Sequence, residues 1–330
     1  MTGRQLYPLR FEPIFQYRLW GGRRLGAWLD TPIPDGPIGE AWILSDRKDH
    51  ASKVAEGALK GRTLTELLKQ LQKPIMGDLA GKFDRFPLLL KFLDVRQMLS
   101  VQVHPGDDQT ALIPPGDEGK TEAWIVLKAD RGARIYAGLK PGTDAGDLRV
   151  LTRMSADDHL ASFTPEVGQG VLIKAGTVHS LGDGIVVFEI QENSDVTFRL
   201  YDWDHVDKKT GKPRDLQVDK ALACVDFDQG AIRPFVPRPE KGAPAARETY
   251  FDNEHFHVDR IIGTAPFSVG ATDTPRILVC VEGSGHVAHD NAEFALDRGG
   301  VMIMPASLGP CPFTPSPQAT ILEIAIPAGK

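Results

Sequence analysis

The chain has 330 residues, of which 42% are hydrophobic and 25% charged, with a formal net charge of −6. This is enough apolar material for one large domain or two ordinary domains with buried cores. The negative balance and the lack of a Lys/Arg block argue against a nucleic-acid-binding protein. A local cationic pocket would still allow a small anionic substrate.

The three cysteines, Cys224, Cys280 and Cys311, stand far apart and show no metal-binding spacing. We therefore expect buried thiols in a reducing compartment. The N-terminal stretch "MTGRQLYPLRF" has no long apolar segment, and no apolar run reaches 18 residues. These features predict a cytoplasmic protein that does not contact membranes.

The first ninety residues predict a strand over 38–46, a helix near 63–73 and a buried strand over 86–94. Thr63 and Glu66 have the spacing of a helix-capping box, and Pro74 is expected just beyond the end of the helix. Lys91 interrupts the apolar run "FPLLLKFL".

From residue 99 onward, six short strands alternate with Gly, Pro and Asp turns, which is typical of β-sandwiches and barrels. Residues 144–163 break this pattern and are expected to form a helical, capping insertion. The segment 228–248 is rich in Pro, Ala and charge and is the expected linker. We expect one unit over 1–235 and a second, strand-only unit over 249–330.

The stretch "SVQVHPGDDQ" places Gln102 and His104 two residues apart, so both face one side of a strand. Glu122 begins the next strand in "GKTEAW", and His179 follows a glycine turn. Two imidazoles, a carboxylate and an amide oxygen suit a zinc-like divalent ion with one position left open. The lack of a thiolate favours a catalytic site over a structural one.

Five motifs, in the order "PLLLKFLD", "LSVQVHP", "GKTEAW", "AGTVHSLGDG" and "SDVTFRLYDW", resemble the type I phosphomannose isomerases of the cupin superfamily. The resemblance covers about residues 10–205. It implies a mainly β protein, with a cupin (jelly-roll-like) barrel, a short helical insertion and a second C-terminal β-barrel. The short spacing between Glu122 and His179 implies a compact, bacterial-type form.

The resemblance also implies an activity: metal-dependent interconversion of mannose 6-phosphate and fructose 6-phosphate through an enediol. It assigns four metal ligands, which are Gln102, His104, Glu122 and His179, with zinc as the expected ion. It assigns substrate and phosphate binding to Ser100, Lys120 and Lys91, and catalysis to Arg199 and Glu189. On regular strands, Ser100 and Lys120 would each lie about 6–7 Å from a metal ligand.

These roles have physical reasons and alternatives. Arg199 keeps its proton and would stabilise enediolate charge, or it simply pairs with Asp195 or Asp202. Glu189 lies in the apolar strand "VVFEIQ", which would raise its pKa for proton transfer, or it belongs to a structural ion pair. Lys120 is otherwise an exposed turn residue.

The C-terminal unit contains a motif-like arrangement of His286, His289 and Glu293, but Gly309 stands where a second-motif histidine would fall. The two histidines are three residues apart, so they do not share a strand face. We therefore expect this unit to bind no metal.

Two other functions fit part of the pattern: an iron-dependent cupin dioxygenase and a non-catalytic sugar- or metal-sensing cupin. An amide ligand with Lys120 and Arg199 nearby favours an anionic sugar over oxygen chemistry. The sequence leaves the oligomeric state and the direction of flux open.

Overall fold

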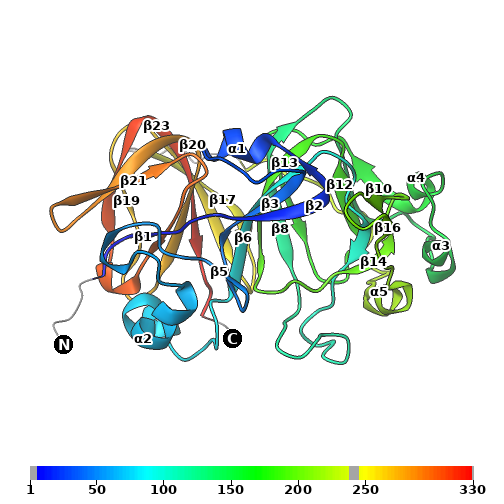
Figure 1. Ribbon diagram of the computed structural model, residues 1–330, viewed down its shortest axis with the longest axis horizontal. Helices are drawn as coiled ribbons and strands as arrows, with labels where there is room; N and C mark the ends of the chain where they lie inside the picture. Colours follow the sequence, from blue (N-terminus) through cyan, green and yellow to red (C-terminus); the bar gives the residue numbers. More distant parts are fainter. Residues whose placement is uncertain (1–5, 238–244, 329–330) are drawn as a thin grey trace.

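The computed structural model describes residues 6–237 and 245–328. The fold is mainly β, as predicted, and its sheets lie in layers across the long axis of the molecule (Figure 1). The C-terminal sheet lies at one end, a six-stranded sheet in the middle, and a five-stranded sheet with three short helices at the other end.

Two antiparallel sheets form the part of the molecule that carries all the predicted site residues. The six-stranded sheet has the order β11 (Gly170–Ile173), β8 (Glu122–Ala129), β13 (Ile185–Glu192), β6 (Leu88–Val95), β2 (Ile14–Gly22) and β3 (Ile38–Leu44). The five-stranded sheet has the order β10 (Leu160–Phe163), β9 (Arg134–Leu139), β12 (His179–Gly182), β7 (Val101–Val103) and β14 (Phe198–Tyr201). An apolar core that includes Trp20, Trp124 and Ile135 fills part of the space between them.

The C-terminal sheet has the order β1 (Leu9–Arg10), β22 (Val301–Met304), β20 (Arg276–His289), β23 (Cys311–Ala325), β18 (His257–Gly263) and β17 (Ala245–Asp252). β19 (Phe267–Val269) pairs with β23, and β21 (Ala292–Asp297) pairs with β20. Strand β1 comes from the start of the chain and pairs with β22. The division into 1–235 and 249–330 therefore stays a prediction, since β1 crosses it.

Alternation along β6 explains why a lysine interrupts an apolar strand. Leu88, Leu90 and Phe92 point toward the C-terminal sheet and join its core. Leu93 points the opposite way, into the core between the six-stranded and five-stranded sheets. These two sheets carry the predicted site and are called the catalytic sheets below. Because side chains alternate along a strand, Lys91 also faces the five-stranded sheet. By the same alternation, every second residue of β8 and β13 points into the space between the two sheets.

Helix α2 spans Leu64–Met76 and begins at Thr63, whose side chain and Glu66 form the predicted capping box. The expected end before Pro74 is wrong, because Pro74 lies inside the element. The backbone leaves helical geometry at Leu71, three residues earlier. Proline lacks an N–H and clashes with the preceding turn, so the element bends there and then continues.

Residues 144–163 are not one helical insertion. They form α3 (Ala145–Arg149), α4 (Ala156–His159) and strand β10. Leu148 and Leu160 pack in a core shared with α5 (Val218–Cys224). Leu160 opposes Leu139 of β9, and this strand pairing overrides the helical pattern. The segment supplies no residue to the cavity that is lined by Gln102, Lys120 and Arg199, so it does not cap that cavity.

The remaining elements are short. They are α1 (Arg24–Trp28), β4 (Asp46–Arg47), β5 (His50–Ala51), β15 (Val206–Asp207), β16 (Lys212–Pro213) and the 3₁₀ turns η1 (Gly57–Leu59), η2 (Gly77–Leu79) and η3 (Ala306–Leu308).

The predicted linker 228–248 is shorter than expected. Ala231 and Phe235 form β-bridges to Gly138 and Gly170, so this part is attached to the first unit. Residues 238–244 lie outside the described residues, and Ala245 already belongs to β17.

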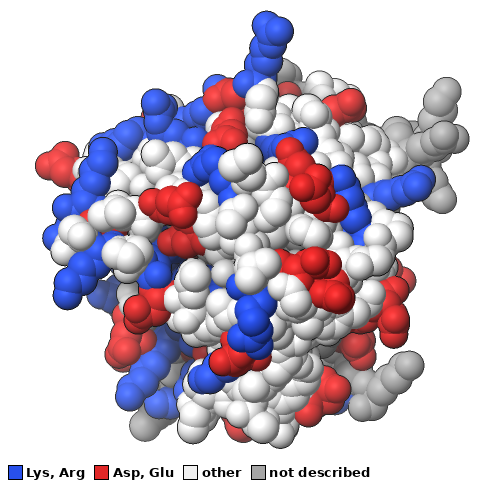
Figure 2. Space-filling model, turned by 90° about the vertical axis from the view of Figure 1, so that its right-hand side faces the viewer, with Lys and Arg blue, Asp and Glu red and all other residues white. Residues whose placement is uncertain are grey.

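The distribution of surface charge and the state of the cysteines agree with what the sequence predicts. On the end of the molecule seen in Figure 2, acidic and basic side chains are intermixed. All three cysteines are buried and free, as predicted. None of the helices within 6–237 and 245–328 has the length and apolar character needed to cross a membrane.

Candidate metal centre and substrate cavity

The predicted metal ligands come from neighbouring strands of the two catalytic sheets. Gln102 on β7 lies directly opposite His179, the first residue of β12. Glu122 begins β8 and His104 follows β7. The ligating atoms of His104, Glu122 and His179 lie within 4.8 Å of one another, and all three residues are buried.

Both imidazoles are held in the tautomer that a metal ion requires. Nδ1 of His104 donates to the Val196 carbonyl at 2.7 Å, and Nδ1 of His179 donates to the Thr177 carbonyl at 2.8 Å. Each Nε2 is therefore the unprotonated nitrogen and carries the lone pair that a metal ion would accept, and the two lie 3.5 Å and 3.4 Å from Glu122. Burial lowers the pKa of both histidines, so the neutral, ligating form is favoured.

Gln102 is close to this cluster but presents its nitrogen to it. Its Nε2 lies 3.1 Å from Nε2 of His179, and its Oε1 accepts the Ser100 hydroxyl at 3.0 Å. Ligation through oxygen would require the amide to turn and exchange both contacts. Ser100 is fully buried and does not line the main cavity. The structure thus places it beneath Gln102, away from the position expected for a phosphate ligand.

Lys120 occupies a different place from the one that a regular strand predicts. Its Nζ lies 2.8 Å from Glu122 Oε2 and 3.3 Å from His104 Nε2, inside the ligand cluster. β8 begins only at Glu122, and the Lys120 backbone is bonded instead to the Pro105 carbonyl. Burial would raise the pKa of Glu122, but Lys120 and His179 outweigh it and lower that pKa. Glu122 is therefore ionised in the cluster, which is the form that binds a divalent cation.

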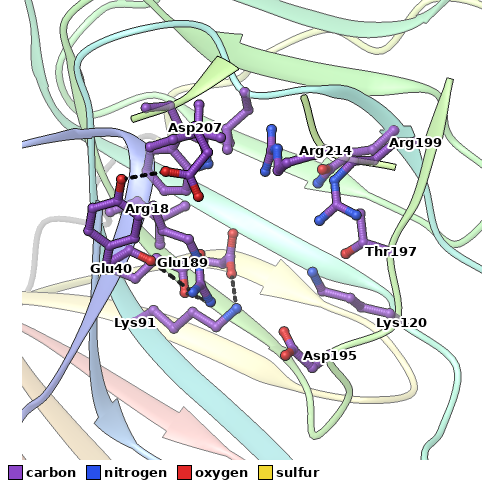
Figure 3. A pocket seen from close by; sticks show the side chains of 16 residues that line it. Arg18, Glu40, Lys91, Lys120, Glu189, Asp195, Thr197, Arg199, Asp207 and Arg214 are labelled. Atoms are coloured by element: carbon purple, nitrogen blue, oxygen red, sulfur yellow. Dashed lines mark hydrogen bonds and ion pairs between the residues drawn. The ribbon is translucent and has the colours of Figure 1, made fainter. Parts of the chain in front are cut away.

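A cavity of about 340 Å³ opens beside the cluster (Figure 3). Its lining includes Gln102 and Lys120, which contact the cluster, whereas His104, Glu122 and His179 do not line it. Its cationic lining residues are Arg18, Lys91, Lys120, Arg199 and Arg214, and its anionic ones are Glu40, Glu189, Asp195 and Asp207. The high density of charge suits a polar, anionic ligand.

Lys91 and Glu189 face each other across β6 and β13 and form a buried ion pair in this cavity. Lys91 Nζ lies 3.0 Å from Glu189 Oε1 and also donates to Gln191. The Trp124 indole donates to the other Glu189 oxygen at 3.0 Å. Burial raises the pKa of Glu189 despite the attraction of Lys91. The pKa shift has the direction that the sequence predicted, and the ion pair is the alternative that the sequence left open, so the catalytic role of Glu189 stays a prediction.

A second pair at the cavity, half-buried Arg18 with buried Glu40, was missed by the sequence reasoning. Two 2.9 Å hydrogen bonds join the guanidinium to the carboxylate, and the Trp42 indole adds a third at 2.7 Å. Burial would raise the pKa of Glu40, but Arg18 and Lys91 lower it to about 2. A charged residue at an inward-facing position of an apolar strand, "IGEAWIL", was the available signal.

Arg199 is the least engaged cation of the cavity. Its Nε is buried and has no hydrogen-bond partner among the described residues. The alternative pairing with Asp202 is not seen, because Asp202 binds Arg214 through both carboxylate oxygens. Figure 3 shows Arg199, Arg214 and Lys120 on one side of the cavity, opposite the Lys91–Glu189 pair. Sequence reasoning gave no signal for Arg214.

Comparison with known proteins agrees with this geometry. The family model described as the phosphomannose isomerase type I catalytic domain matches residues 9–123. The chain is 34% identical over 305 residues to the mannose-6-phosphate isomerase ManA of Bacillus subtilis (strain 168), covering 92% of this chain and 94% of the relative. This chain belongs to the type I phosphomannose isomerase family.

Further relatives support this membership. The probable mannose-6-phosphate isomerase GmuF of the same organism is 32% identical over 305 residues, covering 92% of this chain and 95% of the relative. The crystal structure of the mannose 6-phosphate isomerase from Bacillus subtilis superposes with a TM-score of 0.88 at 28% identity, covering 97% and 99% of the two chains. The cupin fold and the compact form are therefore confirmed.

Family membership also decides between the functions that the sequence left open. The phosphomannose isomerases are aldose–ketose isomerases, so an enzyme of this class is confirmed, and a dioxygenase or a non-catalytic sensor is not favoured. The metal dependence of the family agrees with the cluster of His104, Glu122 and His179.

Proposed function

We propose that this chain interconverts mannose 6-phosphate and fructose 6-phosphate, with one zinc ion held by His104, Glu122, His179 and the reoriented amide of Gln102. The observation that carries the proposal is the pair of neutral imidazoles and a carboxylate beside a cavity whose lining is densely charged and includes five cations. Curated relatives above 30% identity, named as mannose-6-phosphate isomerases, support the substrate. The free, buried cysteines support a reducing, cytoplasmic location.

When bound, the ion would polarise the sugar carbonyl and stabilise developing negative charge. Lys120 now holds its ammonium 2.8 Å from Glu122. A divalent ion held by the same carboxylate would repel that ammonium, so Lys120 would then turn toward the cavity that it lines. There Lys120 would bind an oxygen of the anionic substrate, which keeps the phosphate-binding role as part of the proposal.

Glu189 is the proposed group that moves the proton between C1 and C2. Its buried carboxyl has a raised pKa, and Lys91 and Trp124 hold both of its oxygens. A carboxyl whose pKa is raised toward the operating pH is a better acid–base catalyst than an ordinary glutamate. Lys91 thus orients the carboxylate at the wall of the cavity.

Arg199 is the proposed stabiliser of the enediolate. A guanidinium stays charged, and this one has an unpartnered Nε at the cavity. A donor held in place before the reaction binds the charge that appears after proton abstraction. Ser100 would contribute indirectly, by holding Gln102.

A coupled assay of fructose 6-phosphate formation from mannose 6-phosphate tests this function. We expect turnover in the purified protein, its loss after chelation, and its return on addition of zinc. Full activity in demonstrably metal-free protein would contradict the metal-dependent mechanism, and no turnover of the zinc-loaded protein would contradict the substrate.

A further inference from the structure

The segment Gly119–Thr121 brings both Lys120 and Glu122 to the metal centre, and each of its three backbone N–H groups has a fixed acceptor. Gly119 donates to Asp107 Oδ1 at 2.8 Å, and Lys120 donates to the Pro105 carbonyl at 3.0 Å. Thr121 donates to Glu192 Oε2 at 2.6 Å. Side-chain carboxylates thus fix the backbone on either side of Lys120.

These two carboxylates converge on a histidine from the other end of the sequence. His255 lies in the turn between β17 and β18, and its Nδ1 is 3.1 Å from Glu192 Oε1. The polar atoms of Asp107, Glu192 and His255 lie within 4.8 Å of one another. The backbone N–H of His255 donates to the Asn253 side chain at 2.8 Å, which fixes the turn.

The local charge explains why a donor is needed at this position. Asp107, Glu192 and Glu118 lie close together, and burial with the repulsion of these neighbours raises the pKa of Glu118 to about 7. Glu254 adds a further carboxylate 3.6 Å from His255 Nε2. His255 offsets this repulsion at the two carboxylates that hold the segment.

We propose that His255 is a positioning residue for the metal centre: it contacts Glu192 and lies beside Asp107, and these two carboxylates hold the backbone that presents Lys120 and Glu122. The C-terminal sheet thereby contributes to the active site without touching the substrate. This inference rests on the proposed function, since it needs a metal ion at His104, Glu122 and His179. It adds a role for the C-terminal unit.

The test measures the rate of zinc release from the loaded, full-length protein into a chelator, together with kcat and KM. Loss of groups that orient metal ligands typically weakens binding by about 10- to 100-fold. His255 acts through a carboxylate and a backbone N–H, so we expect His255→Ala to speed release about three- to tenfold. kcat should fall by a similar factor while KM changes less. His255→Asn, which keeps a donor near Nδ1, should restore most of the loss.

His257→Ala is the matched control, because His257 lies on β18 and also contacts carboxylates, Asp252 and Asp259, but not the segment. It should leave zinc release unchanged. Asp107→Ala removes the Gly119 acceptor from an exposed position and should speed release as His255→Ala does, which keeps the test open if His255→Ala misfolds.

Three results would overturn the inference: unchanged release in His255→Ala, an equal effect in His257→Ala, or a second zinc per wild-type chain that His255→Ala alone removes. The last result would make the cluster a metal site of its own. Wild-type protein that binds no zinc would instead refute the proposed metal centre.

Discussion

The two β regions of this chain present opposite kinds of interior. Between the six- and five-stranded sheets, inward positions include Glu122, Glu189 and Lys91 beside apolar neighbours, and a charged cavity opens there. Within the C-terminal sheet, the inward positions of β20, such as Leu278 and Cys280, belong to an apolar core. A few substitutions at alternate positions along a strand thus separate a reactive interior from a packed one.

The histidines make the same distinction. His104 and His179 each have one nitrogen held by a carbonyl and the other turned toward a shared carboxylate. His286 and His289 instead lie near the surface carboxylates of Glu293 and Asp290, and no three-ligand group forms there among the described residues. The absence of metal from the C-terminal unit stays a prediction.

The largest expected effect comes from removing a histidine of the proposed metal centre. His104→Ala or His179→Ala should abolish zinc retention and lower kcat/KM by roughly 10³-fold, since metal polarisation supplies several kcal/mol. The double change His286→Ala/His289→Ala should leave both unchanged. Metal analysis and the coupled assay measure this, and an equal loss in the C-terminal variant would erase the distinction.

One arginine from each region allows the comparison to be tested through kcat and KM. Arg199→Ala should lower kcat by about 10²-fold with a smaller change in KM, because its charge acts mainly after proton abstraction. Arg247 of the C-terminal sheet pairs with Asp259 and Glu323, so Arg247→Ala should change thermal stability and leave kcat intact. A KM effect dominating in Arg199→Ala would assign this residue to substrate binding instead.

A substitution in the C-terminal core should lower the free energy of unfolding without lowering kcat, whereas a substitution of Glu189 in the cavity should lower kcat. Leu278→Ala leaves a cavity in the C-terminal core and should cost about 2–5 kcal/mol of unfolding free energy, with kcat retained in the folded fraction. Glu189→Gln should cost most of the activity and also lower stability, because it leaves the Lys91 ammonium buried without its anion. Denaturant unfolding alongside the assay checks this, and full kcat in the folded fraction of Glu189→Gln would make that carboxylate purely structural.

The smallest effect concerns Glu118, near the contact between the two regions. Its pKa rises from an ordinary 4.5 to about 7 in the folded protein. A raised carboxyl pKa favours folding fully only below pH 4.5, and this contribution is lost as pH rises through 7. Since the side chain is only partly shielded and keeps contact with solvent, which screens its charge, Glu118→Gln should raise the melting temperature by only about 1–2 °C at pH 8 and less at pH 5. An increase that is equal at both pH values would contradict the assignment.

Much of the site could be predicted because its residues break simple patterns. Gln102 and His104 stand at i and i+2 on a strand, and Lys91 and Glu189 interrupt apolar runs that otherwise require buried side chains. The structure brings Lys91 and Glu189 together because β6 and β13 pair in register. The roles of these residues in the reaction stay predictions.

Other features depended on contacts that no local pattern encodes. Lys120 was placed by regular strand geometry, but its backbone follows the loop after His104, which puts its ammonium beside Glu122. Leu160 was assigned to a helix because the local pattern is helical, and its pairing with β9 is a long-range contact that this pattern does not encode. The contact of His255 with Glu192 joins residues that are 63 positions apart in the sequence, so spacing alone gave no signal.

The central claim is that the metal and the chemistry lie between the two catalytic sheets, while the C-terminal sheet supports them from outside. An anomalous difference map from a zinc-loaded crystal tests it most directly. The account predicts one strong peak at about 2.0–2.2 Å from His104 Nε2, His179 Nε2 and a Glu122 oxygen, with Lys120 displaced toward the cavity. A map with no peak at these residues, or with its peak beside His286 or His289, would contradict it.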